Sequence, residues 1–140
     1  MKLTISPTPT TISSPAGPVK LRAFQIALPI QLSVLGILSR EFFAILDTGL
    51  NHNFAIRAEH LQQWAGVSAK QLGMVSINGY PIPIAQADLV LEGATLAFPD
   101  GIAVYPANVP FAPRLPTLGL RALVRNRIRV LIDGADVTIG

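Results

Sequence analysis

Short apolar segments, each bounded by turn-forming residues, account for most of this 140-residue chain and restrict it to a β-rich fold. Between Leu21 and Val34, apolar residues recur mostly at every second position, as in a strand that buries one face. Residues 42–46 (FFAIL) are apolar throughout, as in a strand buried on both faces. We therefore expect an all-β fold built from many short strands.

Two segments break this pattern and favour helix. Apolar residues recur every three positions over residues 57–65, which predicts a helix that ends at Gly66. A second short helix is expected over residues 121–126, after Gly119-Leu120. No internal repeat accompanies these elements.

Two dipeptides mark hairpin turns, because Asn-Gly and Asp-Gly accommodate the positive φ angles that tight hairpins need. Asn78-Gly79 is expected to join strands over residues 72–77 and 82–91. Asp133-Gly134 is expected to join the last two strands of the chain. The other expected strands cover residues 53–56, 94–98, 102–105, 128–132 and 137–139.

The N-terminal segment differs in composition from the rest of the chain. Residues 1–18 are rich in Pro, Thr and Ser and poor in apolar residues, so we expect a flexible leader followed by one domain over residues 19–140. The longest apolar-rich stretch, residues 24–38, is shorter than the roughly 20 apolar residues of a membrane span. The first residues do not build the apolar core of a signal peptide. We therefore expect a cytoplasmic protein with no membrane partner.

The chain has few charged residues to cover its surface. Apolar residues make up 50% of it and charged residues 14%, against a usual charged share of about 25%. We therefore expect further surface to be buried in an oligomer. The absence of cysteine excludes disulfides, thiol catalysis and cysteine-ligated metals, and leaves the redox compartment open.

The net charge of +3 is spread thinly, with one cluster at Arg121, Arg125, Arg127 and Arg129. This cluster is interpreted as a solvated helix face that runs into a strand, with an anionic partner as the alternative. A nucleic-acid surface would need a denser basic stripe with interspersed aromatic residues. No nucleic-acid partner is expected.

Asp47-Thr48-Gly49 places a single carboxylate directly after the apolar run 42–46. An ionised Asp at the end of a buried strand is costly unless it is paired or hydrogen-bonded. Two such carboxylates that face each other across a symmetry axis can share one proton, which is the arrangement of an aspartic protease dyad. The tripeptide alone is a weak signal, and its place between a buried strand and a strand-helix segment strengthens it.

Asp47-Thr48-Gly49, followed far downstream by Leu118-Gly119 and a short helix, is similar to the motif pair of the retropepsin-like aspartic proteases. This single-domain family (clan AA) includes retroviral proteases and many bacterial relatives, and the chain resembles the bacterial type. The resemblance covers about residues 19–139 in the order of the elements. It implies an all-β, closed β-barrel of the acid protease fold with one or two short helices.

The resemblance also implies the roles of the site residues. Asp47 would be the catalytic acid and base, contributed once by each subunit of a homodimer. Thr48 and Gly49 would brace the two loops against each other at the two-fold axis, and Leu118-Gly119 would pack beneath the catalytic loop. Neither a cofactor nor a metal is implied.

The Asn-Gly hairpin would supply the substrate-binding flap. Its tip residues Ile77, Asn78, Gly79 and Tyr80 would close over an extended peptide or protein segment, exclude bulk water and position the peptide by backbone hydrogen bonds. Tyr80 either contacts substrate or covers an apolar edge.

The resulting expectation is an aspartic endopeptidase subunit that activates a water molecule through a dyad of two Asp47 carboxylates. Two positions depart from the family pattern. Leu50 stands where Ser or Ala is usual, and Thr117 replaces an aliphatic residue. The alternative is therefore a non-catalytic dimeric module that binds peptides, and a third interpretation is an unrelated β-barrel whose Asp-Thr-Gly is a chance turn.

The remaining polar and aromatic residues favour structural roles. His52, His60 and Glu59 are too few for a metal site, which needs three or four convergent ligands. His52 is expected to be a polar turn residue, and Trp64 is expected to lie in the core. The acidic residues expected to be solvated are Asp88, Glu92, Asp100 and Asp136.

Overall fold

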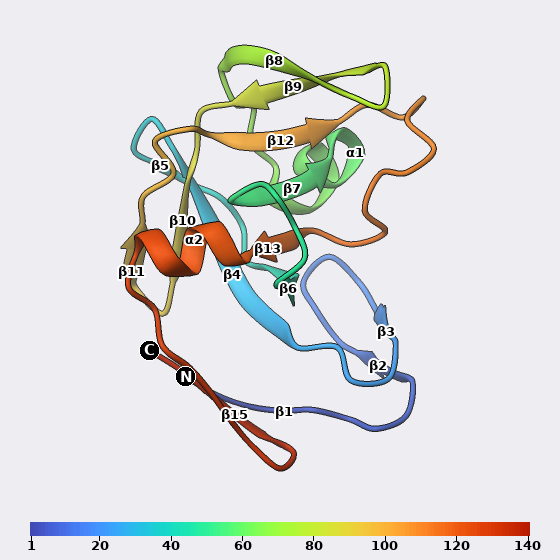
Figure 1. The fold of residues 1–140 in the computed structure, drawn as a ribbon, viewed down its shortest axis with the longest axis vertical. Coiled ribbons are helices and arrows are strands. Elements are labelled where there is room, and N and C mark those ends of the chain that lie inside the picture. Colours follow the sequence, from blue (N-terminus) through green and yellow to red (C-terminus); the bar gives the residue numbers. More distant parts are fainter.

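The computed structural model describes residues 1–140, and the chain is mostly β-structure with two short helical regions (Figure 1). The strands are β1 (Lys2–Thr4), β2 (Thr10–Ile12), β3 (Val19–Leu21), β4 (Ala27–Val34), β5 (Ile37–Leu38), β6 (Phe42–Asp47), β7 (Phe54–Arg57), β8 (Gln71–Ile77), β9 (Tyr80–Ala85), β10 (Asp88–Leu91), β11 (Ala94–Leu96), β12 (Ile102–Tyr105), β13 (Thr117–Gly119), β14 (Val130–Asp133) and β15 (Asp136–Ile139). The helical regions are α1 (Ala58–His60), continued by the π-helical segment η1 (Leu61–Ala65), and α2 (Leu120–Arg125). None of them is long and apolar enough to cross a bilayer.

The main sheet is open, although a closed barrel was expected. Its strands follow the order β11-β10-β4-β6-β13-β7-β12-β9-β8, with β5 paired to β4 beside that path. The end strands β11 and β8 each pair with one neighbour. In Figure 1 β8 lies at the top of the molecule and β11 at its lower left, so these two edges are too far apart to close the sheet. The prediction of a β-rich fold is confirmed, and the prediction of a closed barrel is wrong.

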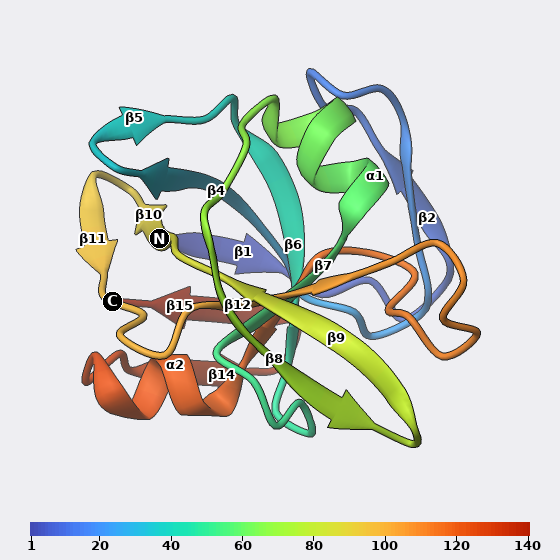
Figure 2. The same ribbon diagram turned by 90° about the horizontal axis from the view of Figure 1, so that it is seen from above.

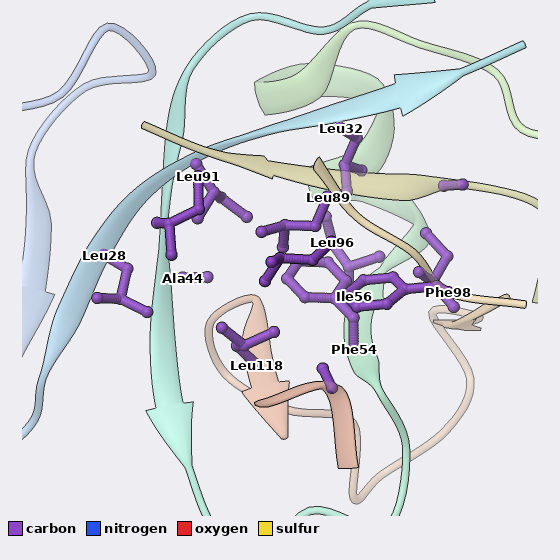
Figure 3. Packing of buried hydrophobic residues seen from close by; sticks show 14 of the residues in the cluster. Leu28, Leu32, Ala44, Phe54, Ile56, Leu89, Leu91, Leu96, Phe98 and Leu118 are labelled. Atoms are coloured by element: carbon purple, nitrogen blue, oxygen red, sulfur yellow. The ribbon is translucent and has the colours of Figure 1, made fainter. Parts of the chain in front are cut away.

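The core forms where alternating side chains of the main sheet turn inward. In β4, Leu28, Ile30, Leu32 and Val34 are buried, while the residues between them are partly exposed. Each fully buried side chain of this size stabilises the fold by about 1.5–3 kcal/mol. Figure 3 shows other residues of the same buried cluster, which come from other strands and from the loop after β11, among them Ala44, Phe54, Ile56, Leu89, Leu91, Leu96, Phe98 and Leu118.

Residues 1–18, expected to form a flexible leader, take part in two strand pairs. β1 pairs with β15, which also pairs with β14, and β2 pairs with β3. Met1, Leu3 and Ile5 pack against the main core, and the N-terminal ammonium group donates a 2.9 Å hydrogen bond to the carbonyl oxygen of Ile139. A flexible leader was expected because residues 1–18 contain few apolar residues. The few that alternate here are enough to let the segment pair with other strands. The domain boundary after residue 18 stays a prediction.

The expected strand over residues 82–91 is divided into two. β9 ends at Ala85 and β10 begins at Asp88. Between them, the amide of Gln86 donates a 2.7 Å hydrogen bond to the carbonyl oxygen of Lys70, and Ala87 is buried. The chain therefore leaves β9 after Ala85 and continues into β10, which lies near the opposite end of the same sheet.

The expected helices are confirmed. Residues 58–65 form α1 and η1, and Gly66 ends the helical region with φ of 68°, a conformation that favours glycine. The second helix, α2, begins one residue before the expected position.

Candidate active site

Asp47 is the last residue of β6 and is exposed on the turn that follows. The amide of Gly49 donates a 2.9 Å hydrogen bond to Asp47 Oδ1. The amide of Leu50 lies 3.3 Å from the carbonyl oxygen of Asp47 and closes the turn. One carboxylate oxygen is thus held by the backbone of its own loop, and Oδ2 has no hydrogen-bond partner within the chain.

The loop after Asp47 is held in place by β13, which lies between β6 and β7 in the sheet. β13 runs parallel to β6, and Gly119 stands opposite Asp47 in the register. The amide of Gly119 donates a 2.9 Å hydrogen bond to the carbonyl oxygen of Asn53. A Cβ on Gly119 would collide with the carbonyl oxygen of His52, so only glycine fits here. Gly119 therefore lies against the loop that follows Asp47, and the supporting role of Leu118 and Gly119 in an active site stays a prediction.

Thr117 begins β13 and is buried. Its hydroxyl donates a 2.9 Å hydrogen bond to the carbonyl oxygen of Leu115. A buried hydroxyl is costly only when it lacks a partner. Thr117 is therefore accommodated in the place of an aliphatic residue without an unpaired polar group.

An apolar hollow of about 520 Å³ lies directly beside Asp47. Thr48, also exposed, borders it together with Leu120, Val124 and Ile132, apolar side chains that are 44%, 67% and 58% exposed. Asp47 is the only acidic residue in its lining. The site of a single chain thus combines one carboxylate with an uncovered apolar surface.

The β8–β9 hairpin has the turn that the sequence predicts. Asn78 and Gly79 have φ angles of 50° and 80°, as a tight hairpin of this kind requires. Ile77 and Tyr80, at the strand ends, pack against the same small apolar cluster as Leu50, the residue after Gly49. The hairpin and the loop of Asp47 therefore share a packing cluster, but no hairpin residue lines the hollow beside Asp47. A flap function stays a prediction.

Tyr80 packs against the loop that follows β12, and a contact with substrate stays a prediction. Its ring meets Phe111 edge to face with centroids 5.5 Å apart, and Phe111 meets Tyr105 in the same way at 6.2 Å. Such aromatic pairs add about 0.5–1.5 kcal/mol beyond the burial of area. The rings connect the hairpin to the loop that follows β12.

His52, expected to be a polar turn residue, lies half-buried between the loop of Asp47 and β12. Its ring meets Tyr105 edge to face, with centroids 6.4 Å apart. Burial and, to a smaller extent, the positive charge of Arg121 lower the pKa of His52. Both effects favour the neutral form of the imidazole.

His60 is a second half-buried histidine, on α1. Its ring stacks on Trp64 at 3.9 Å, and burial lowers its pKa. Trp64 is partly buried and packs against two core clusters, in agreement with its predicted core position. No group of three or more His, Cys, Asp and Glu side chains is placed to hold a metal ion.

Two residues of the site region were not predicted. Asn53 is 2% exposed; its Nδ2 donates a weak 3.5 Å hydrogen bond to the carbonyl oxygen of Gly101, and its Oδ1 has no partner. Arg57 Nε donates a 2.7 Å hydrogen bond to the carbonyl oxygen of Pro113 and so fixes the loop that carries Phe111. Only one feature of the sequence could have indicated Asn53 and Arg57: each is a polar residue beside the apolar residues of β7.

Among the acidic residues expected to be solvated, Glu92 and Asp100 are exposed and Asp88 is partly buried, and all three have partners. Asp88 accepts a 2.9 Å hydrogen bond from the amide of Phe98, Asp100 pairs with Arg125 on α2, and Glu92 lies 3.2 Å from the N-terminal ammonium group. The contacts of Asp100 and Glu92 join segments far apart in the sequence, so local pattern could not predict them. Asp136 is exposed, as expected.

Comparisons with known proteins return few matches. No protein-family model matches the chain, and no curated protein matches it. Among solved structures, the chain is similar to a retropepsin-like aspartic protease from Rickettsia conorii, with 14% sequence identity and a TM-score of 0.47 over 100% of this chain and 98% of the other.

Proposed function

We propose that this chain is one subunit of a homodimeric aspartic endopeptidase, in which two Asp47 carboxylates activate the water that cleaves a peptide bond. The observation that carries the proposal is the geometry of Asp47. Its carboxylate is exposed, fixed by the amide of Gly49 and placed beside an apolar hollow that contains no second acidic residue. One chain thus supplies half of a two-carboxylate site.

The surface around Asp47 supports a symmetric pairing of two chains. Leu120, Val124 and Ile132 are all exposed and border the same hollow. Contiguous exposed apolar surface is typical of a protein interface. A two-fold axis that passes close to Asp47 buries this surface and brings the same residue from both subunits together. Thr48, exposed and without a side-chain hydrogen bond in the chain, is then free to bond across the axis.

The chemistry follows from two carboxylates held close together, because they share one proton. The ionised carboxylate takes a proton from a water molecule as its oxygen attacks the peptide carbonyl carbon. The protonated carboxylate donates its proton to the carbonyl oxygen. Collapse of the tetrahedral intermediate breaks the carbon–nitrogen bond, and the leaving nitrogen takes up a proton from the dyad.

The β8–β9 hairpin is the element proposed to close over the bound peptide. It lies at one end of the main sheet, where β8 is an edge strand that pairs with β9 alone. Figure 2 shows the two strands of the hairpin side by side. Closure excludes water and orients an extended segment through backbone hydrogen bonds. The tip of the hairpin, through Ile77 and Tyr80, packs against the same cluster as Leu50, so closure places it close to the loop of Asp47.

Substitution of Asp47 tests this function. We expect Asp47→Asn to lower kcat by about 10²–10⁴-fold, because the amide cannot take up or donate the shared proton. Cleavage of an unfolded protein substrate is followed by mass spectrometry at mildly acidic pH. Glu41→Gln is the matched control, since Glu41 is an exposed acid just before the same strand. Unchanged cleavage by Asp47→Asn would exclude the mechanism.

A non-catalytic peptide-binding dimer is the second candidate, and Leu50 is the observation that favours it. Its side chain packs against the apolar cluster at the hairpin and offers no hydrogen-bond donor to Asp47. The two functions differ in one readout. Inhibition of cleavage by a pepstatin-type compound, with higher activity at acidic pH, supports the enzyme, whereas peptide affinity without turnover supports the binding module.

A further inference from the structure

The positive charge of the chain is concentrated in one short segment. Residues 120–129 contain four arginines and no acidic residue. Since the chain has eleven Lys and Arg against eight Asp and Glu, seven basic and eight acidic residues remain outside this segment. The positive excess of the whole molecule therefore belongs to α2 and the turn that follows it.

Three of these arginines border the surface around Asp47. The apolar hollow that contains Asp47 is also lined by Arg127. A second hollow of about 410 Å³ adjoins it and is lined by Arg121 and Arg125. Both hollows share Thr48, together with Leu120 and Val124 of α2. The two adjoining hollows thus place three arginine side chains on the surface around Asp47.

The charges on this surface are only partly neutralised. Arg125 pairs with Asp100, whereas Arg121 and Arg127 are exposed and have no acidic partner within salt-bridge distance. The positive charge of Arg121 also reaches the loop of Asp47, where it contributes to lowering the pKa of His52. Asp47 is the only acidic residue that lines either hollow.

Resting on the proposed function, we propose that the preferred substrates are extended polypeptide segments with Asp or Glu close to the cleaved bond, whose carboxylates are bound by Arg121. Arg121 lines the hollow that also contains Leu50, which packs against the same cluster as the hairpin, whereas Arg127 lines the hollow that the proposed dimer buries. The guanidinium group binds carboxylates through paired, charge-assisted hydrogen bonds. Its charge also offsets the repulsion between Asp47 and an acidic substrate. Arg121 is therefore a specificity-determining residue that acts outside the proton transfer.

Cleavage of matched peptides tests the preference. A peptide that the protein cuts is compared with the version in which its Asp and Glu are replaced by Asn and Gln. We expect kcat/KM to be about three- to tenfold higher for the acidic peptide, with the advantage falling as salt is added. Arg121→Gln removes the advantage, and replacement of Arg129 by Gln, at a position that lines neither hollow, keeps it. Equal rates for both peptides in the unsubstituted protein overturn the proposal.

Binding measurements separate this inference from the proposed catalysis. Fluorescence anisotropy gives the affinity of Asp47→Asn for labelled acidic and neutral peptides. A preference for the acidic peptide that disappears in Arg121→Gln supports the inference even if no peptide is cleaved, in which case only the proposed catalysis fails. Two outcomes overturn the inference: stronger binding of single-stranded RNA than of the acidic peptide, and loss of the dimer in Arg121→Gln by sedimentation.

Discussion

The amide of Gly119 donates a 2.9 Å hydrogen bond to the carbonyl oxygen of Asn53, and the carbonyl oxygen of His52 occupies the space that a side chain on Gly119 would need. β13 therefore supports the loop of Asp47 at a separation that only glycine permits. The two motifs that stand far apart in the sequence, Asp47-Thr48-Gly49 and Leu118-Gly119, depend on each other through this contact.

Substitution of Gly119 by Ala tests this dependence. The new Cβ meets fixed backbone atoms of His52 and Leu50, so the loop must shift. We expect the free energy of unfolding to fall by about 1–3 kcal/mol and peptide cleavage to fall with it. Urea denaturation and a cleavage assay measure the two effects. Gly140→Ala, where a Cβ meets no atom within 4 Å, should change neither, and a stable, fully active Gly119→Ala would contradict the proposed support.

The sequence predicted those parts of the fold that depend on local pattern. The positive φ angles at Asn78 and Gly79, and at Gly66 after η1, follow from residue types that tolerate them. The strand before Asp47 follows from its apolar run. At these positions the local conformational preference of the residues agrees with the tertiary structure, so the sequence pattern was sufficient to predict the conformation.

The parts that were not predicted depend on contacts between distant segments. β13 has only three residues and follows a proline-rich loop, and it is a strand because β6 and β7 flank it. β1 is ordered by its pairing with β15 at the other end of the chain. The buried side chain of Asn53 is a further case, because its hydrogen bond to Gly101 spans 48 positions.

Exposed apolar residues around Asp47 lead to a prediction about assembly. Val124 is 67% exposed on α2 and borders the hollow beside Asp47. We expect Val124→Lys to convert the dimer into a monomer and to abolish cleavage, because the charge would be buried in the interface. Lys is tolerated near the end of a helix, so the monomer should stay folded. Light scattering after gel filtration measures the mass.

The control for this change is an equally exposed residue elsewhere on the surface. Ile37 in β5 is 66% exposed, has a similar shape and borders neither hollow. Ile37→Lys should keep both the dimer mass and the activity. Loss of the dimer in Ile37→Lys but not in Val124→Lys would place the interface on a different face.

The lowered pKa of His60 predicts how stability depends on pH. In the unfolded chain a histidine titrates near 6.5, whereas burial lowers the pKa of His60 in the folded protein. Between the two values the unfolded chain binds more protons, so the free energy of unfolding falls as the pH decreases from about 6.5 through the folded pKa. His60→Phe keeps an aromatic ring against Trp64 and should make this decrease shallower in urea denaturation. An unchanged pH dependence would contradict the prediction.

Arg121 provides the last prediction, because its charge contributes to lowering the pKa of His52 in the loop after Asp47. Arg121→Gln removes that charge and leaves the burial of His52 unchanged, so the pKa should rise only part of the way to its ordinary value of 6.5. NMR titration of the imidazole signals measures the pKa of His52. The difference in this pKa between the unsubstituted protein and Arg121→Gln should become smaller as salt is added, because salt screens the charge of Arg121. Arg129→Gln should leave the pKa of His52 unchanged. If Arg121→Gln has no effect either, the positive surface on α2 does not extend to the loop of Asp47.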